Sequence, residues 1–245
     1  MAREKTPEEQ TTDNERKQLA EEKKKQEGAN VEDALSQSEA FIVKNKTTII
    51  GFIVAIVVII AGVMLYKHYV SEPKEQKAAV AIFKGEEYFG ANDYEKALNG
   101  DSLGYAGFIK IADEFSGTKS GKLAKAYAGI SYAQLGKYEE AIKYLNSFDG
   151  EDQMVGPAAL GALGDCYAQL DQLDKATAAF LKAADKADNN TLSPIYLKKA
   201  GAIFEKQGKY DDAVKAYTKV KDKYFNSYQA MDIDKYIDRA NAAKK

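Results

Sequence analysis

The chain has 245 residues, enough for one or two domains. Its 35 Lys and Arg nearly balance its 37 Asp and Glu, and from residue 67 onward each kind numbers 26. A surface that binds nucleic acid needs a basic excess to neutralise phosphate, so this balance argues against a nucleic-acid partner. The single cysteine, Cys166, cannot form an internal disulfide and leaves the redox compartment open.

Residues 1–46 form a charged tail. Residues 1–28 are rich in Glu, Lys, Gln and Thr and contain almost no large apolar residue, which predicts disorder or a solvated single helix. Residues 31–42 place several apolar side chains near one helical face. This pattern predicts either a short helix on a membrane surface or a continuation of the apolar segment that follows.

Residues 47–66 contain no charged side chain and match the thickness of a bilayer. Their Ile, Val, Leu and Phe residues favour insertion by about 4–7 kcal/mol in total, which predicts a single transmembrane helix over residues 47–67. The count of Lys and Arg close to the two ends does not decide the orientation. A short tail without a signal peptide, followed by a large domain, predicts an uncleaved signal anchor with a cytoplasmic amino terminus.

A phrase of fourteen residues then recurs along the chain. Two close copies occupy residues 128–141 and 200–213, and looser copies start at Leu163 and Lys84. Successive copies start 44, 35 and 37 residues apart. One helix pair cannot bury its apolar face alone but stacked neighbours can, so the recurrence predicts an all-α array of about four helical hairpins.

Small residues stand at fixed places within the phrase. A glycine lies three residues before an aromatic residue, and an alanine follows twelve residues after the glycine. We expect the glycine of the first helix to meet the alanine of the second, because both allow close approach. Gly136 and Gly208 stand where a left-handed residue ends a helix, and Asp171 and Asn92 take that place in the other copies.

The first copy matches the others at its start and then departs from them. Residues 99–102 read Asn-Gly-Asp-Ser and interrupt the second helix, so residues 103–115 are expected to complete it. At the other end of the chain, residues 227–242 place apolar side chains close to one stripe and predict a C-terminal capping helix.

These patterns resemble the tetratricopeptide repeat (TPR), which has a small residue, an aromatic, a glycine, a second aromatic and an alanine at fixed positions. The resemblance implies a TPR-like α-solenoid over residues 71–245. The signature positions are Gly129, Tyr132, Gly136, Tyr138, Ala141, Gly164, Tyr167, Ala176, Gly201, Phe204, Gly208, Tyr210 and Ala213.

The resemblance also implies a concave groove lined by the first helix of each hairpin. Its expected residues are apolar at one end and charged at the other, which favours an extended or helical peptide. The alternative is that the chain's own last helix fills the groove. The groove positions are Ile82, Glu86, Phe89, Ile130, Gln134, Asp165, Gln169, Ile195, Lys198, Glu205 and Lys206.

Residues for catalysis are scarce. The only histidine, His68, lies at the predicted membrane boundary, so Ser/His/Asp and Cys/His catalysis and a His/Cys zinc site lack their ligands. Residues 117–123 fall one residue short of a phosphate loop and are expected to form a turn between helices. We therefore predict a non-enzyme without cofactor, metal or small-molecule substrate.

The whole layout of charged tail, single anchor and repeats resembles the bacterial YfgM-like family, ancillary subunits of the Sec translocon. This resemblance implies a single-pass protein of the bacterial inner membrane with its TPR domain in the periplasm, working beside translocon and chaperone components. The sequence thus predicts a membrane-anchored scaffold or co-chaperone for protein secretion. The alternative is a self-associating organiser of an envelope complex.

Overall fold

The computed structural model describes residues 42–150 and 152–244, and these residues form helices without any strand. They divide into two units, one ending at Tyr66 and the other beginning at Lys67. The predictions for residues 1–28 and for nearly all of residues 31–42 lie outside the described residues. For the described residues, the predicted all-α fold is confirmed.

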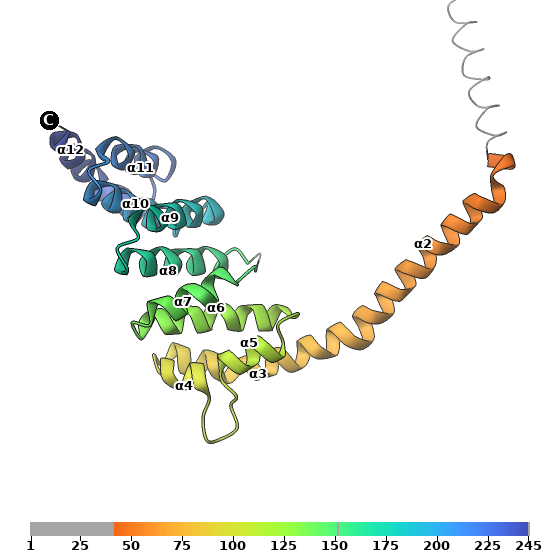
Figure 1. The fold of residues 1–245 in the computed structure, drawn as a ribbon. Helices are drawn as coiled ribbons and strands as arrows, with labels where there is room; N and C mark the ends of the chain where they lie inside the picture. Colours follow the sequence, from red (N-terminus) through yellow and green to blue (C-terminus); the bar gives the residue numbers. More distant parts are fainter. Residues whose placement is uncertain (1–41, 151, 245) are drawn as a thin grey trace, which may run out of the picture. The chain divides into compact units, whose positions relative to one another are not determined.

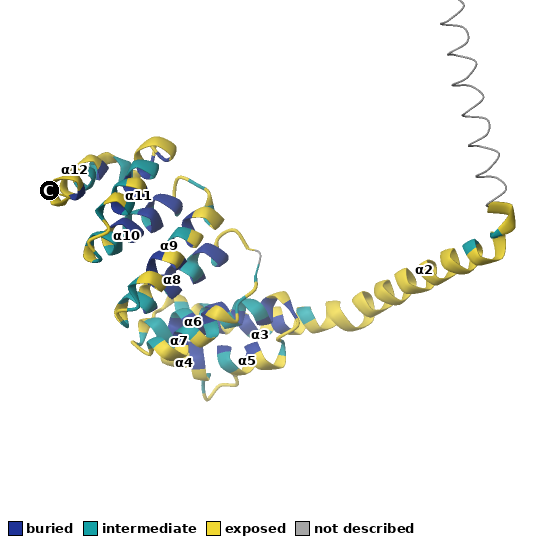
Figure 2. Ribbon diagram, turned by 45° about the horizontal axis from the view of Figure 1, so that its top comes forward, coloured by how far each residue is buried: buried dark blue, intermediate teal, exposed yellow. Residues whose placement is uncertain are grey.

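The described part of the first unit is dominated by α2, Lys46–Tyr66, which begins one residue before the predicted span. No residue of α2 is buried, and its apolar side chains face outward on every side. Figure 2 shows α2 exposed along nearly all of its length. In the part of the chain described, a single helix is long and apolar enough to cross a bilayer, and α2 supplies its apolar stretch.

The second unit opens with a short π-helix, Lys67–Ser71, and continues as helices that pair along the chain (Figure 1). The hairpins consist of α3 (Glu72–Gly90) with α4 (Tyr94–Asn99) and α5 (Phe108–Glu114), α6 (Lys119–Gln134) with α7 (Tyr138–Asn146), α8 (Val155–Gln169) with α9 (Leu173–Ala187), and α10 (Ser193–Lys206) with α11 (Tyr210–Lys223). A 3-10 turn, Tyr228–Asp232, and α12, Ile233–Ala243, follow. The predicted array of four hairpins is therefore present.

The turns inside the hairpins have the predicted backbone conformation. Gly136 and Gly208 have φ values of 72° and 71°, and Asn92 and Asp171 have 58° and 55° at the matching places. Left-handed backbone is costly for residues with a Cβ, so glycine, asparagine and aspartate are the residue types that fit here.

Gly208→Ala is expected to lower the free energy of unfolding by about 1–2 kcal/mol, because alanine is strained at positive φ. Gly90→Ala is the matched control: Gly90 is helical and has open space around its Cβ position. That control should be neutral or stabilising by up to about 1 kcal/mol. Urea unfolding followed by circular dichroism measures both, and equal losses would contradict the assignment of the turn.

The glycines of the first helices do permit close packing, but their partners differ from the prediction. A Cβ at Gly129 would lie 2.6 Å from the Leu145 side chain, and one at Gly164 would lie 2.7 Å from the Phe180 ring. Gly201 likewise faces the ring of Tyr217. In these three hairpins the facing residue stands four positions after the alanine, so the glycine accommodates a bulky side chain one helical turn further on.

The interruption of the first hairpin is confirmed, although its second part starts later than predicted. Residues 100–107 form a loop, and the helix begins at Phe108, whose ring is buried in the core. Asp101 orders the loop by accepting hydrogen bonds from the N–H groups of Leu103 and Tyr105. Residues 117–123 are only partly a turn, because Thr118 caps α6 and the helix begins at Lys119.

The last helix packs as a cap on the array. Ile233 and Ala240 of α12 are buried in the apolar core that α9, α10 and α11 share. Tyr228 and Met231, expected on the same packed stripe, are instead exposed. They lie in the 3-10 turn before α12, whose period of three residues takes their side chains out of the helical stripe.

Candidate functional site

The predicted groove residues lie on α3, α6, α8 and α10, the first helices of the hairpins, and all but one reach the surface. The exception is Ile82, which is only 4% exposed and belongs to the core of the first hairpin. Ile82 therefore cannot line an open groove, because its side chain packs inward between α3 and its neighbours. The exposed members are Gln134, Asp165, Gln169 and Lys206.

The amino-terminal half of this surface is aromatic and apolar. The Phe89 ring lies 5.6 Å from Tyr94 and 4.9 Å from Tyr127, both in edge-to-face geometry. Tyr127 also stacks on Phe108 at 5.1 Å between ring centroids. Ile130 follows one turn later on α6 and is half-buried. These partly exposed rings form a surface suited to apolar contact with a peptide.

Sequence reasoning missed Tyr127, which links the first two hairpins. Burial raises its pKa to about 12, and the nearby Glu86 carboxylate acts in the same direction. The phenol is therefore neutral at any physiological pH and can serve as a hydrogen-bond group. Its position three residues before Ile130 places both on one helical face, which is the signal that could have identified it.

The carboxyl-terminal half of the surface is charged, and its charges are paired within the chain. Lys199 contacts Asp165 at 2.7 Å, and Lys206 contacts Asp171 at 2.7 Å. The Nε and Nη2 groups of Arg239 donate to the two oxygens of Glu205 at 2.8 Å. The members of each pair stand 34 or 35 residues apart, which is one repeat.

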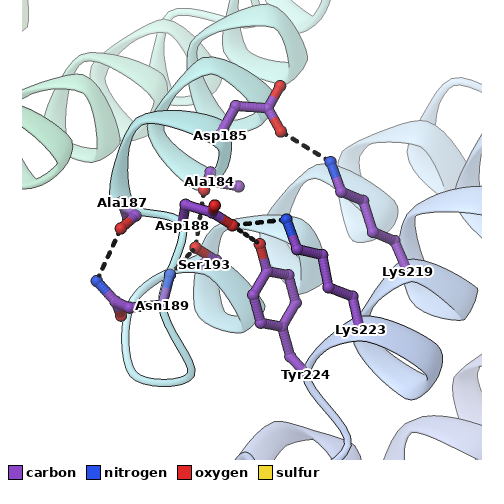
Figure 3. Close-up of polar contacts among 9 residues, drawn as sticks. All are labelled: Ala184, Asp185, Ala187, Asp188, Asn189, Ser193, Lys219, Lys223 and Tyr224. Carbon is purple, nitrogen blue, oxygen red and sulfur yellow. Dashed lines mark hydrogen bonds and ion pairs between the residues drawn. The ribbon is translucent and has the colours of Figure 1, made fainter.

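The same spacing recurs on the second helices. Figure 3 shows the carboxylates of Asp185 and Asp188 reaching Lys219 and Lys223 at 2.7 and 2.6 Å. Tyr224 donates a second hydrogen bond to Asp188 at 3.0 Å. These two partners, Lys223 first, hold the pKa of the Asp188 carboxyl below its usual value. Pairs between neighbouring repeats therefore run along both helix layers.

The chain's own end covers the last hairpin. Lys198 contacts Asp232 at 2.9 Å, and its Nζ lies 4.2 Å above the ring of Tyr236 on α12. Glu205 is held by Arg239 of the same helix. Two of the predicted groove positions are thus occupied by the C-terminal segment, whereas Phe89 and Ile130 remain partly exposed.

Glu205→Gln is expected to lower the free energy of unfolding at pH 7 by about 1–3 kcal/mol, because charged hydrogen bonds to Arg239 and Tyr217 are lost. Burial alone raises the Glu205 pKa, but the bonds from Arg239 and Tyr217 outweigh it and the pKa lies below its usual value. This stabilisation is present above the unfolded-state pKa of about 4.3 and is lost as pH falls through the folded-state value.

The difference between the variant and the parent chain should therefore shrink in acid. Urea unfolding at pH 7 and at about pH 3 measures it. Glu140→Gln is the control, because Glu140 is exposed on α7 and has no ion-pair partner in the described ranges. A difference that is unchanged in acid would contradict the role of the Glu205 charge.

Residues for metal or nucleophilic chemistry do not gather on this surface. Within residues 42–150 and 152–244, no group of three His, Cys, Asp or Glu is placed to hold a metal ion. Cys166 is buried in α8, and burial raises its pKa to about 11. Its thiol is therefore protonated at neutral pH and packs as a small apolar side chain.

Comparison with known families accounts for the repeated hairpins. One tetratricopeptide repeat family matches residues 128–148 and 157–187, and another matches residues 197–227. The hairpins from α6 to α11 are tetratricopeptide repeats. The matches begin at the second hairpin, in agreement with the interrupted second helix of the first.

Two known proteins are similar to parts of this chain. "Protein FLUORESCENT IN BLUE LIGHT, chloroplastic" of Arabidopsis thaliana is 29% identical over 111 residues, which cover 43% of this chain and 34% of that protein. The chain thus matches about a third of this relative's length. The crystal structure of MamA protein superposes with a TM-score of 0.50 at 17% identity, over 68% of this chain and 87% of that one, and shows the shared fold.

A TPR array presents an extended concave surface that binds other proteins. In this TPR domain the aromatic, partly exposed end around Phe89, Tyr127 and Ile130 is the portion available for such contact. The charged end is engaged by neighbouring repeats and by α12. The partly exposed aromatic residues toward the amino-terminal half are therefore the candidate contact surface of the TPR domain.

Proposed function

We propose that the chain is a membrane-anchored TPR scaffold or co-chaperone that docks protein partners and carries out no catalysis of its own. The observation that carries this proposal is a wholly exposed apolar helix, α2, followed by a TPR domain with partly exposed aromatic residues. An apolar helix of this length is stable in lipid and costly in water. Lipid is therefore the environment that suits α2.

The proposed location is the bacterial inner membrane, with the tail in the cytoplasm and the TPR domain in the periplasm. The layout of charged tail, anchor and repeats supports this orientation, as does its resemblance to the YfgM-like subunits of the Sec translocon. The proposed partners are translocon or chaperone components that handle emerging proteins. Alkaline phosphatase fused to the carboxyl terminus tests the orientation: an active fusion supports it, and an inactive fusion at normal expression overturns it.

Crosslinking in intact membranes tests the function. A photo-crosslinking residue at Ile130 should give adducts with translocon or chaperone subunits, because Ile130 lies in the open part of the groove. The control position is Glu139, which is exposed on α7, in the layer of second helices. Adducts at both positions in equal yield would contradict a specific groove. Adducts of the chain with itself alone would instead support a self-associating organiser of an envelope complex.

A further inference from the structure

The first helix of the TPR domain carries an exposed apolar face. Val80 and Phe83 of α3 are 78% and 62% exposed. A shallow hollow of about 470 Å³ lies at this face and is lined by Pro73, Gln76, Lys77, Val80 and Ala81. We call Pro73, Val80 and Phe83, with the hollow, the α3 face. Pro73 and Val80 lie on the side of α3 opposite Phe89, and Phe83 lies between that side and the groove positions.

The matching positions in the later repeats are buried against the repeat before them. Counted from the start of each copy of the phrase, Val80 corresponds to Ala124, Ala159 and Tyr196, all of which are buried. The Tyr196 ring packs on Gly161 of the preceding first helix. Tyr127, the counterpart of Phe83, stacks on Phe108 of the preceding hairpin. The α3 face is thus the surface on which a preceding repeat would stack.

The two ends of the array differ in whether a further helix follows the hairpins: α12 packs at the carboxyl-terminal end (Figure 1). At the carboxyl-terminal end α12 buries Ile233 and Ala240 and turns polar side chains outward, among them Asp234 and Asp238. Repeat arrays need such polar caps for solubility. Within the described residues, no helix covers α3 in the same way. The array is capped at one end and open at the other.

The charges beside the α3 face indicate what kind of surface would cover it. Lys74 and Lys77 are exposed and have no carboxylate partner among the residues that the structure describes. Each neighbouring acidic residue has a partner: Glu72 contacts His68, Glu75 accepts from the N–H groups at the start of α6, and Glu87 pairs with Lys84. Among the described residues, the charged side chains beside this face that have no such partner are therefore the cations Lys74 and Lys77.

We propose that the α3 face docks an amphipathic helix of a different protein, which stacks on α3 as a preceding repeat would. That helix carries an apolar stripe for Val80 and Phe83 and Asp or Glu residues that reach Lys74 and Lys77. A second copy fits less well, because a symmetric pair of parallel α3 helices would bring Lys77 against Lys77. The outer face of α12 itself is polar, and the exposed Tyr228 and Met231 lie in the 3-10 turn before it.

A photo-crosslinking residue at position 83 of the full chain, in its own membranes, tests this proposal. We expect a heteromeric adduct in which the crosslinked partner peptide, identified by mass spectrometry, is an amphipathic helical segment flanked by Asp or Glu. Position 238 on the capped end is the control and should give no such adduct. Val80→Asp should reduce the adduct at least about tenfold, since a charge replaces buried apolar contact.

Charge variants test the partner's chemistry. Lys77→Glu should reduce the adduct and Lys77→Arg should retain it, while the melting temperature of each stays near the parent value because the side chain is exposed. An adduct with a second copy, with lipid or with residues 1–41, or a yield no higher than at position 238, would overturn the proposal. Crosslinking from position 130 should be unchanged in the Val80→Asp chain, because the groove and the α3 face bind separately. Docking in the groove and docking on the α3 face can therefore fail independently.

Discussion

Phe180→Ala is expected to lower the free energy of unfolding of the TPR domain by about 3–5 kcal/mol. Phe180 is 2% exposed, and its ring occupies the space that Gly164 leaves open in the facing helix. Removal of the ring leaves a cavity between α8 and α9, because glycine has no side chain that could fill it. The same apolar core includes Tyr196 and Leu197 of the next hairpin, so the contact between repeats weakens as well.

Urea unfolding and thermal melting measure this loss in the full chain held in detergent. In a domain of this size each kcal/mol corresponds to about 2–4 °C in melting temperature. Phe225→Ala is the matched control, because Phe225 is 67% exposed and its removal should change stability by no more than about 0.5 kcal/mol. Similar losses of unfolding free energy in the two variants would show that the Phe180 ring does not contribute to core packing.

The repeated phrase predicted the array of hairpins because its glycines, aromatics and alanines mark helix faces that need a neighbour. It could not identify the residue opposite each glycine. Spacing within one helix fixes a face, whereas the register between two helices depends on the length and conformation of the turn. Gly164 therefore meets Phe180 rather than Ala176, since the two helices are offset by one turn relative to the simplest pairing.

The predicted groove likewise was only partly predictable from the sequence. Its positions were assigned helix by helix, and this treatment could not reveal that Asp165 and Lys199 would pair. The spacing of 34 residues between them was nevertheless present in the sequence. Opposite charges one repeat apart are a usable signal for contacts between neighbouring repeats. The same spacing of 34 residues separates Glu205 from Arg239 of α12, so this signal extends to the cap beyond the last repeat.

Replacing Val57 and Ile60 of α2 together by arginine is expected to abolish membrane integration. Each arginine near the centre of a bilayer costs about 2.5–3.5 kcal/mol and removes a favourable contribution of up to about 0.6 kcal/mol. The pair therefore opposes insertion by about 6–8 kcal/mol, which is similar to or larger than the about 4–7 kcal/mol that the apolar residues supply. Neither side chain is buried against protein that could compensate the charge.

Carbonate extraction of vesicles followed by sedimentation measures the effect: the parent chain should stay in the pellet and the double variant should move to the supernatant. Val57→Leu with Ile60→Leu is the control and should remain in the pellet, because leucine preserves the apolar surface. Helical content should be similar in all three, since no residue of α2 is buried. Release of the parent chain by carbonate would show that α2 is held by another protein rather than by lipid, and the anchored scaffold would then be wrong.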